Sequence, residues 1–430
     1  MRTGPLLGWF FIGLAHGLGV SSPGYTAVMI VPTGIAASIG GYAGDSMPVA
    51  RTLASVVDTL VTHPNVMNGA QMYAPQTNIL YVEGYALDQW ARGHWGLVPM
   101  ESRGHRIGLV LDAAIANDMR IRHLQAANAA RATLGIDVAE YIVTDEDLGV
   151  ELGLSSSGAS WGTLKRPASL LRAARHLVEE KHCSALAIVT NFPDDEDEAM
   201  LEAYRHGAGV DAIGGAEAII SHLVTQELVV PCAHAPALPP LDVDPNVSPR
   251  ACAEELGYTF LPCILANLHR APTIVQSRDN DIKNRCVAII YEETLIFPCH
   301  SHFAVSILDR PIWASDIDAL VVPLSACGGS AVLSLSYRRD ILTILVEVSK
   351  TRIFVYLYLH TKKMPLSYVL PCFAQDNETA MKATPSVVGL KSASNSNLMT
   401  ARSYFEAAGI LAAHRSGISL SALNSGSHGI

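Results

Sequence analysis

Cys327 is the residue whose surroundings in the sequence most favour nucleophilic chemistry. It lies in ALVVPLSACGGSAVLS, where an apolar run ends at Pro323 and two glycines precede a short helical pattern. A thiol at a helix N-terminus is stabilised as the thiolate by free backbone N–H groups, which lowers its pKa. With Gly328 and Gly329 allowing a sharp turn, the same N–H groups could form an oxyanion hole. The run therefore predicts either a thiol nucleophile or a buried structural cysteine, which is the commoner fate.

Glu83 and His63 are the candidates for proton transfer. They lie in the most polar stretch of the chain, HPNVMNGAQMYAPQTNILYVEGYALDQWARG, which spans residues 63–93. A carboxyl group and an imidazole can move protons to and from a substrate near neutral pH. The side chains of Asn68 and Asn78 can hydrogen-bond a small polar ligand. The competing interpretation is structural, with Glu83 capping a helix and the amides packing a loop.

Two glycine-bearing turns are candidate binding sites for an anion. Gly34, Gly40 and Gly41 lie in VPTGIAASIGGYAGD, which connects an apolar strand to a helix, and Gly214 and Gly215 lie in VDAIGGAEAIISH. Glycines let backbone N–H groups approach an anion closely, and a helix N-terminus favours negative charge. Neither run has the spacing of a phosphate-binding motif, so a tight turn is the structural alternative.

The sequence indicates no metal site and identifies no cofactor. The eight cysteines form no C-x-x-C pair, so reduced and mostly buried thiols are expected. The acids of VTNFPDDEDEAM precede a helical pattern and are expected to complement its N-terminus. Glu217 and His222 are five residues apart, so they diverge on a helix instead of forming a metal pair. As the base that would activate Cys327, the sequence leaves His63, His222 and His234 open.

Six apolar runs predict buried strands, and six amphipathic or alanine-rich runs predict helices. The strand-like runs are continuous rather than alternating, as in parallel sheets covered on both faces. They span residues 26–32, 106–112, 185–190, 227–232, 319–323 and 341–347. The helical runs span residues 47–61, 114–134, 167–180, 195–205, 216–223 and 399–414. This alternation predicts an α/β fold of mainly parallel sheets flanked by helices, arranged in two lobes.

Changes in composition along the chain suggest where its parts begin and end. We expect an extra N-terminal segment (1–24), an α/β domain (25–235), a Pro-rich linker-like excursion (236–250) and a second α/β region (251–430). In the last region, two stretches differ in character from their surroundings and are treated as suspected non-native insertions.

The suspected insertions, residues 348–375 and a stretch near 277–304, have the look of translated introns. Removing residues 348–375 joins a strand-like run to DNETAMKATP, and both of its ends can be encoded as splice sites. The stretch near 277–304 ends in residues that can be encoded as a pyrimidine tract and acceptor site. The alternative is that both stretches are native, since RIFVYLYLH is a plausible strand by composition.

Charge and hydropathy exclude several classes of partner. The formal net charge is −10 and no Lys/Arg cluster offsets it, which argues against a nucleic-acid partner. No segment reaches the roughly 18 to 20 uninterrupted apolar residues of a membrane span. A chain of 430 residues, 49% hydrophobic and 16% charged, is typical of a soluble globular protein of two or three domains. The expected partner is a small-molecule ligand, and homo-oligomerisation is left open.

The chain resembles a family of cyanobacterial and plant-plastid proteins known as a domain of unknown function. Five runs carry the resemblance: VPTGIAASIGGYAGD, HPNVMNGAQMYAPQTNILYVEGYALDQW, IGGAEAIISH, WASDIDALVVPLSACGGSAVLS and NETAMKATP. It implies a plastid or chloroplast setting, although no transit peptide is visible, and it implies no catalytic residues. A fainter likeness from Asn68 to Gly93 is to the α-subunit precursor of the glycine and betaine reductase substrate-binding component. That likeness implies at most a related scaffold.

Two functions from different classes fit these features. One is an enzyme acting on a small polar or anionic metabolite at the carboxyl ends of parallel strands. Cys327 would be its nucleophile or anion site, with Glu83 or His63 moving protons. The other is a non-catalytic metabolite-binding or regulatory protein. A third outcome is a mis-spliced chain that folds poorly and is inactive.

Overall fold

A computed structural model describes the chain over residues 24–34, 46–67, 76–100, 104–154, 160–193, 198–239, 241–255, 261–276, 310–347 and 397–423. Outside these ranges lie the predicted ligand residues Gly40, Gly41 and Asn68, most of the N-terminal segment 1–24 and both suspected insertions.

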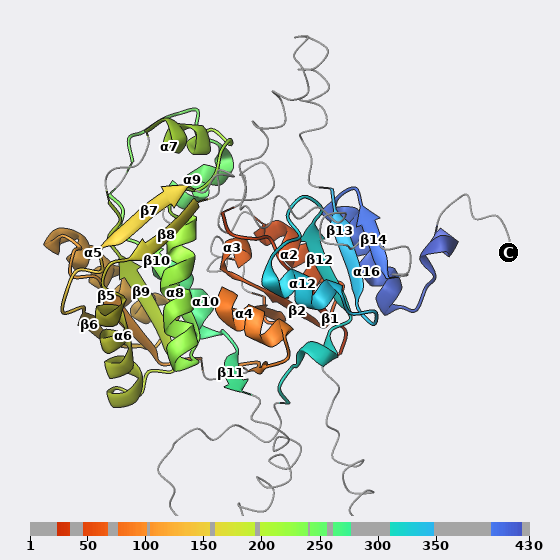
Figure 1. The fold of residues 1–430 in the computed structure, drawn as a ribbon, viewed down its shortest axis with the longest axis horizontal. Helices are drawn as coiled ribbons and strands as arrows, with labels where there is room; N and C mark the ends of the chain where they lie inside the picture. The colour runs from red at the N-terminus through yellow and green to blue at the C-terminus, as the bar shows by residue number, and fades with distance from the viewer. Residues whose placement is uncertain are drawn as a thin grey trace, which may run out of the picture.

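The first sheet has six parallel strands in the order β14-β13-β12-β1-β2-β3 (Figure 1). Its strands come from both ends of the chain: β1 (Thr26–Met29), β2 (Thr59–Thr62), β3 (Ile79–Tyr81), β12 (Ala319–Pro323), β13 (Leu342–Val346) and β14 (Leu398–Ala401). Helices cover both faces, so successive residues of one strand enter different cores. Ala27 and Met29 pack into the core that includes α2 and α16, whereas Val28 packs into the core that includes α4 and α12.

The elements around the first sheet are short. The helices are α2 (Met47–Ala54), α3 (Pro64–Met67), α4 (Gly84–Ala91), α12 (Ser330–Ser336) and α16 (Tyr404–Arg415), with 3-10 turns η4 (Ala314–Asp316) and η6 (Leu420–Leu423). Below the sheet in Figure 1, β4 (Trp95–Val98) pairs antiparallel with β11 (Thr273–Gln276). Among the described residues, no helix is both long and apolar enough to cross a membrane.

The second sheet, on the left of Figure 1, has four parallel strands in the order β10-β9-β5-β6. They are β5 (Ile107–Leu111), β6 (Val138–Val143), β9 (Ala185–Thr190) and β10 (Cys232–Pro236). Helices α5 (Asn117–Leu134) and α10 (Leu261–His269) pack on one face, and α6 (Pro167–Arg175) and α8 (Gly214–Leu228) on the other. The remaining elements are β7 (Val150–Leu154), β8 (Ser160–Leu164), the π-helical turn η3 (His176–Glu180), α7 (Glu198–Arg205) and α9 (Pro249–Glu255).

The α/β class with mainly parallel sheets flanked by helices is confirmed. The first sheet, however, takes strands from both sides of residues 236–250, the stretch predicted as a linker-like excursion. β1 pairs directly with β12, with Ala27 opposite Ala319, so the first sheet needs both halves of the chain. The second sheet is built from the residues in between. Composition marks a Pro-rich stretch, but only the pairing of distant strands reveals this interleaving.

The run 227–232, predicted as a strand, is mostly not one. Helix α8 continues to Leu228 and ends at Val229, which takes the left-handed conformation at φ 55°. β10 begins only at Cys232. β-branched residues favour strands, but here the apolar face of α8 packs on the sheet and extends the helix past the predicted boundary.

The interleaved first sheet makes its short central strands important for stability. Leu60 of β2 is fully buried, so we expect Leu60→Ala to lower the free energy of unfolding by about 2–5 kcal/mol through lost burial and a cavity. Ile121→Ala, at a position that is 47% exposed, is the control and should change it little. Urea unfolding followed by circular dichroism measures both. Equal midpoints for the two variants would contradict the placement of β2.

Candidate functional site

The three predicted catalytic residues follow strands of the first sheet. His63 follows β2, Glu83 follows β3 and Cys327 follows β12. The carboxyl ends of parallel strands meet at one edge, so all three residues lie at the same edge of the sheet. The chain leaves β1 toward β2 and leaves β12 toward β13, in opposite directions. The gap between β1 and β12 is therefore a switch point, where α/β sheets commonly bind ligands.

We call the first sheet with its helices the first lobe and the second sheet with its helices the second lobe. Glu83 connects the two lobes through both oxygens of a side chain that is only 1% exposed. Its Oε2 accepts hydrogen bonds from the backbone N–H groups of Tyr85 (2.8 Å) and Ala86 (3.2 Å), which caps α4. Its Oε1 accepts from the Ser221 hydroxyl (3.3 Å) and contacts Nδ1 of His222, both on α8. A buried carboxylate is costly unless it is satisfied, and these four contacts satisfy it.

His222 has the geometry of a base held by a carboxylate. Its Nδ1 faces the Glu83 carboxylate, so this nitrogen carries the proton and Nε2 is left as an acceptor. The side chain is 39% exposed. Gly84 makes room for the ring, because a Cβ at that position would lie 2.6 Å from Cε1 of His222. Burial opposes the charged form, yet the Glu83 carboxylate and, more weakly, Asp88 raise the pKa of His222 above its ordinary 6.5.

Further polar side chains lie behind Glu83. The Ser221 hydroxyl is 3.1 Å from Nδ1 of His234 on β10, and Nε2 of His234 is 3.7 Å from a carboxylate oxygen of Glu217. Burial, with a smaller effect of His222, lowers the pKa of His234 to about 3, so this ring is neutral at physiological pH. The groups form a continuous chain from the partly exposed His222 through Glu83 and Ser221 to the interior.

Cys327 is fully buried in the core that includes α4 and α12. Burial raises the pKa of its thiol to about 11, the opposite direction from the expected lowering. Desolvation is the largest effect on this thiol, and a backbone hydrogen bond that lowers its pKa does not offset it. In the first turn of α12, the N–H of Ala331 donates to Asp88 (2.9 Å).

His63 and Asn78 have structural partners. Nε2 of His63 accepts a hydrogen bond from the N–H of Val31 (3.0 Å) at the end of β1, and burial lowers the pKa of His63 to about 4. The amide of Asn78 donates to the carbonyl of Ala54 (2.8 Å) and thereby holds β3 near the end of α2. Both contacts match the loop-packing alternative considered from the sequence.

The structure brings Gly34, Gly214 and Gly215 together around Ser160 of β8. A Cβ on Gly34 would lie 3.4 Å from Oγ of Ser160, and a Cβ on Gly215 would lie 2.3 Å from its carbonyl oxygen. The N–H of Gly215 donates to Oγ of Ser160 (3.2 Å), and the N–H of Gly214 donates to the carboxylate of Asp211. At this end of α8, glycine permits close packing of β8, and these two N–H groups already have protein acceptors.

The other predicted glycines lie next to Cys327. Gly328 is buried and Gly329 is partly exposed immediately before α12. Gly329 has φ −66° and ψ 153°, which any residue can adopt, so its glycine is not required by backbone conformation.

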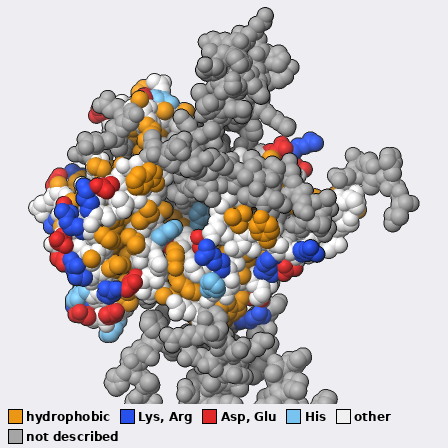
Figure 2. All heavy atoms as spheres, viewed as in Figure 1, with side chains coloured by type: hydrophobic (Ala, Val, Ile, Leu, Met, Phe, Trp, Pro, Cys, Tyr) orange, Lys and Arg blue, Asp and Glu red, His pale blue; other side chains and the backbone are white. Residues whose placement is uncertain are grey.

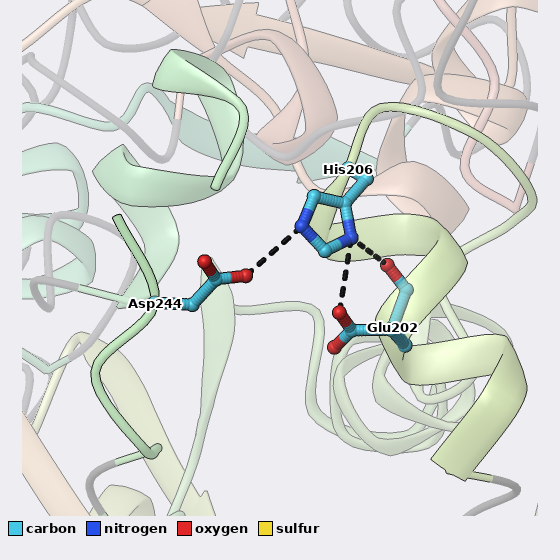
Figure 3. Close-up of side chains that lie close together, drawn as sticks. All are labelled: Glu202, His206 and Asp244. Carbon is cyan, nitrogen blue, oxygen red and sulfur yellow. Dashed lines mark hydrogen bonds and ion pairs between the residues drawn. The ribbon is translucent and has the colours of Figure 1, made fainter. Parts of the chain in front are cut away.

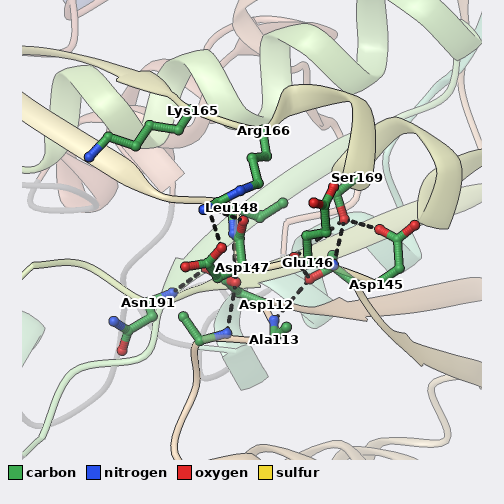
Figure 4. A network of polar contacts seen from close by, with 12 residues as sticks. Asp112, Ala113, Asp145, Glu146, Asp147, Leu148, Lys165, Arg166, Ser169 and Asn191 are labelled. Carbon is green, nitrogen blue, oxygen red and sulfur yellow. Dashed lines mark hydrogen bonds and ion pairs between the residues drawn. The ribbon is translucent and has the colours of Figure 1, made fainter.

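A second polar network lies at the carboxyl-terminal ends of the strands of the second sheet, and its groups bond to one another (Figure 4). Asp112 is fully buried and accepts from the backbone N–H groups of Ala114 and Leu148, each at 3.0 Å, and of Asn191 at 3.3 Å. Arg166 pairs with Asp147 beside it. Because these contacts join the loops after β5, β6 and β9, the network explains how this edge is held together. It does not leave a reactive group exposed comparable to His222.

Figure 2 shows the same side of the molecule as spheres. Histidine side chains are among those along the boundary between the lobes, and charged side chains gather at the outer margin of the second lobe. The boundary is where α4 packs against α8. The Glu83–His222 pair therefore lies where the two lobes meet.

Comparisons with known proteins place the chain among proteins whose function is unknown. A family model described as "Protein of unknown function (DUF3326)" matches residues 26–370. The chain is also 58% identical over 247 residues to an uncharacterized lipoprotein of a Synechococcus strain, covering 57% of this chain and 68% of that protein. No solved structure matches the chain. The comparisons bear out the resemblance to a domain of unknown function and do not show the one to the glycine and betaine reductase component.

The raised pKa of His222 predicts a stability difference that depends on pH. Protonated His222 stabilises the folded state below the unfolded pKa of about 6.5, and this contribution is lost as the pH rises through the higher folded pKa. We expect His222→Gln to have a lower urea midpoint than the wild type at about pH 5.5 and the same midpoint at about pH 9. His94→Gln, at an exposed position, is the control. A deficit equal at both pH values would contradict the assignment.

The raised pKa of Cys327 predicts an unreactive thiol. In the folded protein at about pH 8, we expect iodoacetamide to label the partly exposed Cys252 well before the buried Cys327. The reason is that iodoacetamide alkylates only those thiolates that it can reach. In urea the two should react at similar rates. Peptide mass spectrometry measures both, and rapid labelling of Cys327 in the folded state would restore it as a candidate nucleophile.

Proposed function

Because this chain belongs to the DUF3326 family of proteins of unknown function, we propose its function from the site alone. The proposal is an enzyme in which His222, oriented by Glu83, is the general acid–base for a small polar or anionic metabolite. The observation that carries it is a buried carboxylate holding Nδ1 of a histidine whose side chain is partly exposed. A carboxylate that fixes the tautomer and orientation of an imidazole is a recurrent arrangement in proton-transfer enzymes.

Electrostatics around His222 support the choice of substrate class. Glu83 and Asp88 favour the protonated ring, and in that state it can donate a proton or attract an anionic group. When neutral, its Nε2 accepts a proton. In this proposal Glu83 is a positioning residue. Cys327 takes no part in proton transfer, since its thiol is buried and its pKa is raised.

The alternative is a non-catalytic binding or regulatory protein. It is favoured by the structural work that the polar residues already perform: Glu83 caps α4, and His63 and Asn78 hold strand ends together. In that case the Glu83–His222 pair would serve to fix the lobes relative to each other.

Two further proposals concern the origin of the chain. A cyanobacterial relative is compatible with a plastid setting for this protein.

The suspected insertion at 348–375 begins immediately after Glu347. Glu347 follows the last residue of β13, and its N–H donates to the carbonyl of Ala401 (2.8 Å). Its absence from the mature protein would thus leave β13 intact, which supports a retained intron.

Substitution of the pair tests the proposed enzyme. The turnover of each compound in a panel of small carboxylates, amides and phosphate esters is measured by NMR. We expect Glu83→Gln and His222→Gln to lower the turnover rate roughly 10²- to 10⁴-fold through lost acid–base catalysis, with His94→Gln at the wild-type rate. Unchanged turnover in His222→Gln would exclude the proposal. Ligand-induced thermal stabilisation without turnover in any variant would favour the binding alternative.

A further inference from the structure

Three side chains able to bind a metal ion meet near α7, which lies at the top left of Figure 1; Figure 3 shows them from close by. Glu202 lies on α7 and His206 follows one turn later, while Asp244 lies between β10 and α9. One ligand atom from each residue lies within 4.8 Å of the others. Their surface is distinct from the Glu83–His222 pair, and the sequence analysis indicated no metal site here.

The contacts of His206 require a positive charge at Nε2, either on the ring or on a bound cation. Nδ1 lies 2.9 Å from the backbone carbonyl oxygen of Glu202 and 3.2 Å from a carboxylate oxygen of the same residue; both can only accept, so Nδ1 carries a proton. Nε2 lies 2.9 Å from Oδ2 of Asp244, which is also an acceptor. A neutral imidazole donates from one nitrogen only. The second contact therefore needs either another proton on the ring or a cation shared by Nε2 and Asp244.

The distances suit a metal ion. Two donors each about 2.1 Å from a tetrahedral ion are about 3.4 Å apart. Nε2 and Oδ2 are 2.9 Å apart, so a shift of about half an ångström would admit the ion. A ligating histidine usually donates its other N–H to a carbonyl or carboxylate, as Nδ1 of His206 does. Negative charge is in excess, since Arg205, the neighbouring cation, is bound mainly by Glu255 (2.8 Å) and lies 3.6 Å from Glu202.

Among the described residues, the segment around this cluster buries few apolar side chains and is held mainly by polar contacts. Its apolar core consists of Tyr204 and Ala251 with Val247 packed against them. The carbonyl of Asp242 accepts from Arg205 (2.7 Å), and the N–H of Ser248 donates to the carbonyl of Arg205 (2.8 Å). Small structural units with so little apolar burial are often stabilised by a metal ion.

We propose that Nε2 of His206, Asp244 and, once its carboxylate rotates away from Nδ1, Glu202 bind a divalent transition-metal ion such as Zn²⁺, which fastens residues 241–248 to α7. The nitrogen and carboxylate donors, with no thiolate, fit Zn²⁺ or a neighbouring first-row ion better than Ca²⁺, which prefers oxygen donors alone. The site is structural in this proposal and is independent of the acid–base pair.

Calorimetric titration with ZnCl₂ after treatment of the full chain with a chelator tests the site. We expect one Zn²⁺ to bind the wild type and the affinity to fall more than about tenfold in His206→Gln and Asp244→Asn. His176→Gln is the matched control: His176 is also 36% exposed and also contacts a glutamate four residues away, but no second carboxylate of the described residues forms an ion pair with it. It should bind as the wild type does.

Hydrogen exchange of the wild type gives a second readout that needs no variant. Zn²⁺ should slow exchange of the backbone amides of residues 241–248 and leave those around His176 unchanged. If binding is the same in His206→Gln as in the wild type, or if Zn²⁺ does not protect residues 241–248, the contact is a protonated His206 alone and the proposal is wrong.

Discussion

The parallel pairing of β1 with β12 is the constraint on which the rest of the molecule depends. Strands from opposite ends of the chain lie side by side at the centre of the first sheet, with Ala27 opposite Ala319. The second sheet must therefore be formed by the residues between them. The same pairing reverses the direction in which strands are added and aligns the loops that follow β12, β1, β2 and β3 at one edge. This topology places Glu83 at that edge of the first sheet, where it faces α8 of the second lobe.

Burial of one carboxylate couples the lobes at that edge. Removing a charge from water costs several kcal/mol unless hydrogen bonds replace the lost solvation. Glu83 obtains them partly from the first turn of α4, in its own lobe, and partly from α8, in the other. Neither set alone uses both oxygens, so the contact between the lobes supplies the partners of Oε1. The pair is thus a structural contact as well as the proposed reactive centre, and these roles are compatible.

The fold class could be predicted from the sequence because buried parallel strands leave continuous apolar runs, as at Ala319–Pro323. β2 and β3 could not, since strands of three or four residues beside polar loops carry too little periodicity. Glu83 was identified from its polar surroundings, but its partner was not. His222 is 139 residues away, and only the packing of α8 against α4 selects it over His63 and His234. For Cys327 the local pattern left a nucleophile and a buried structural cysteine open, and burial in the core that includes α4, which the pattern does not contain, favours the second.

The distance along the chain between β1 and its neighbour β12 has a consequence for synthesis of the protein. The N–H of Thr26 donates to Asp318, 292 residues later. At translation rates of about 5–20 residues per second, the N-terminal strands wait roughly 15 to 60 s before β12 leaves the ribosome. During that time one edge of β1 has no partner, while the second lobe can already be complete. Chaperone binding to the nascent N-terminal strands would shield their apolar faces until the last part of the polypeptide emerges.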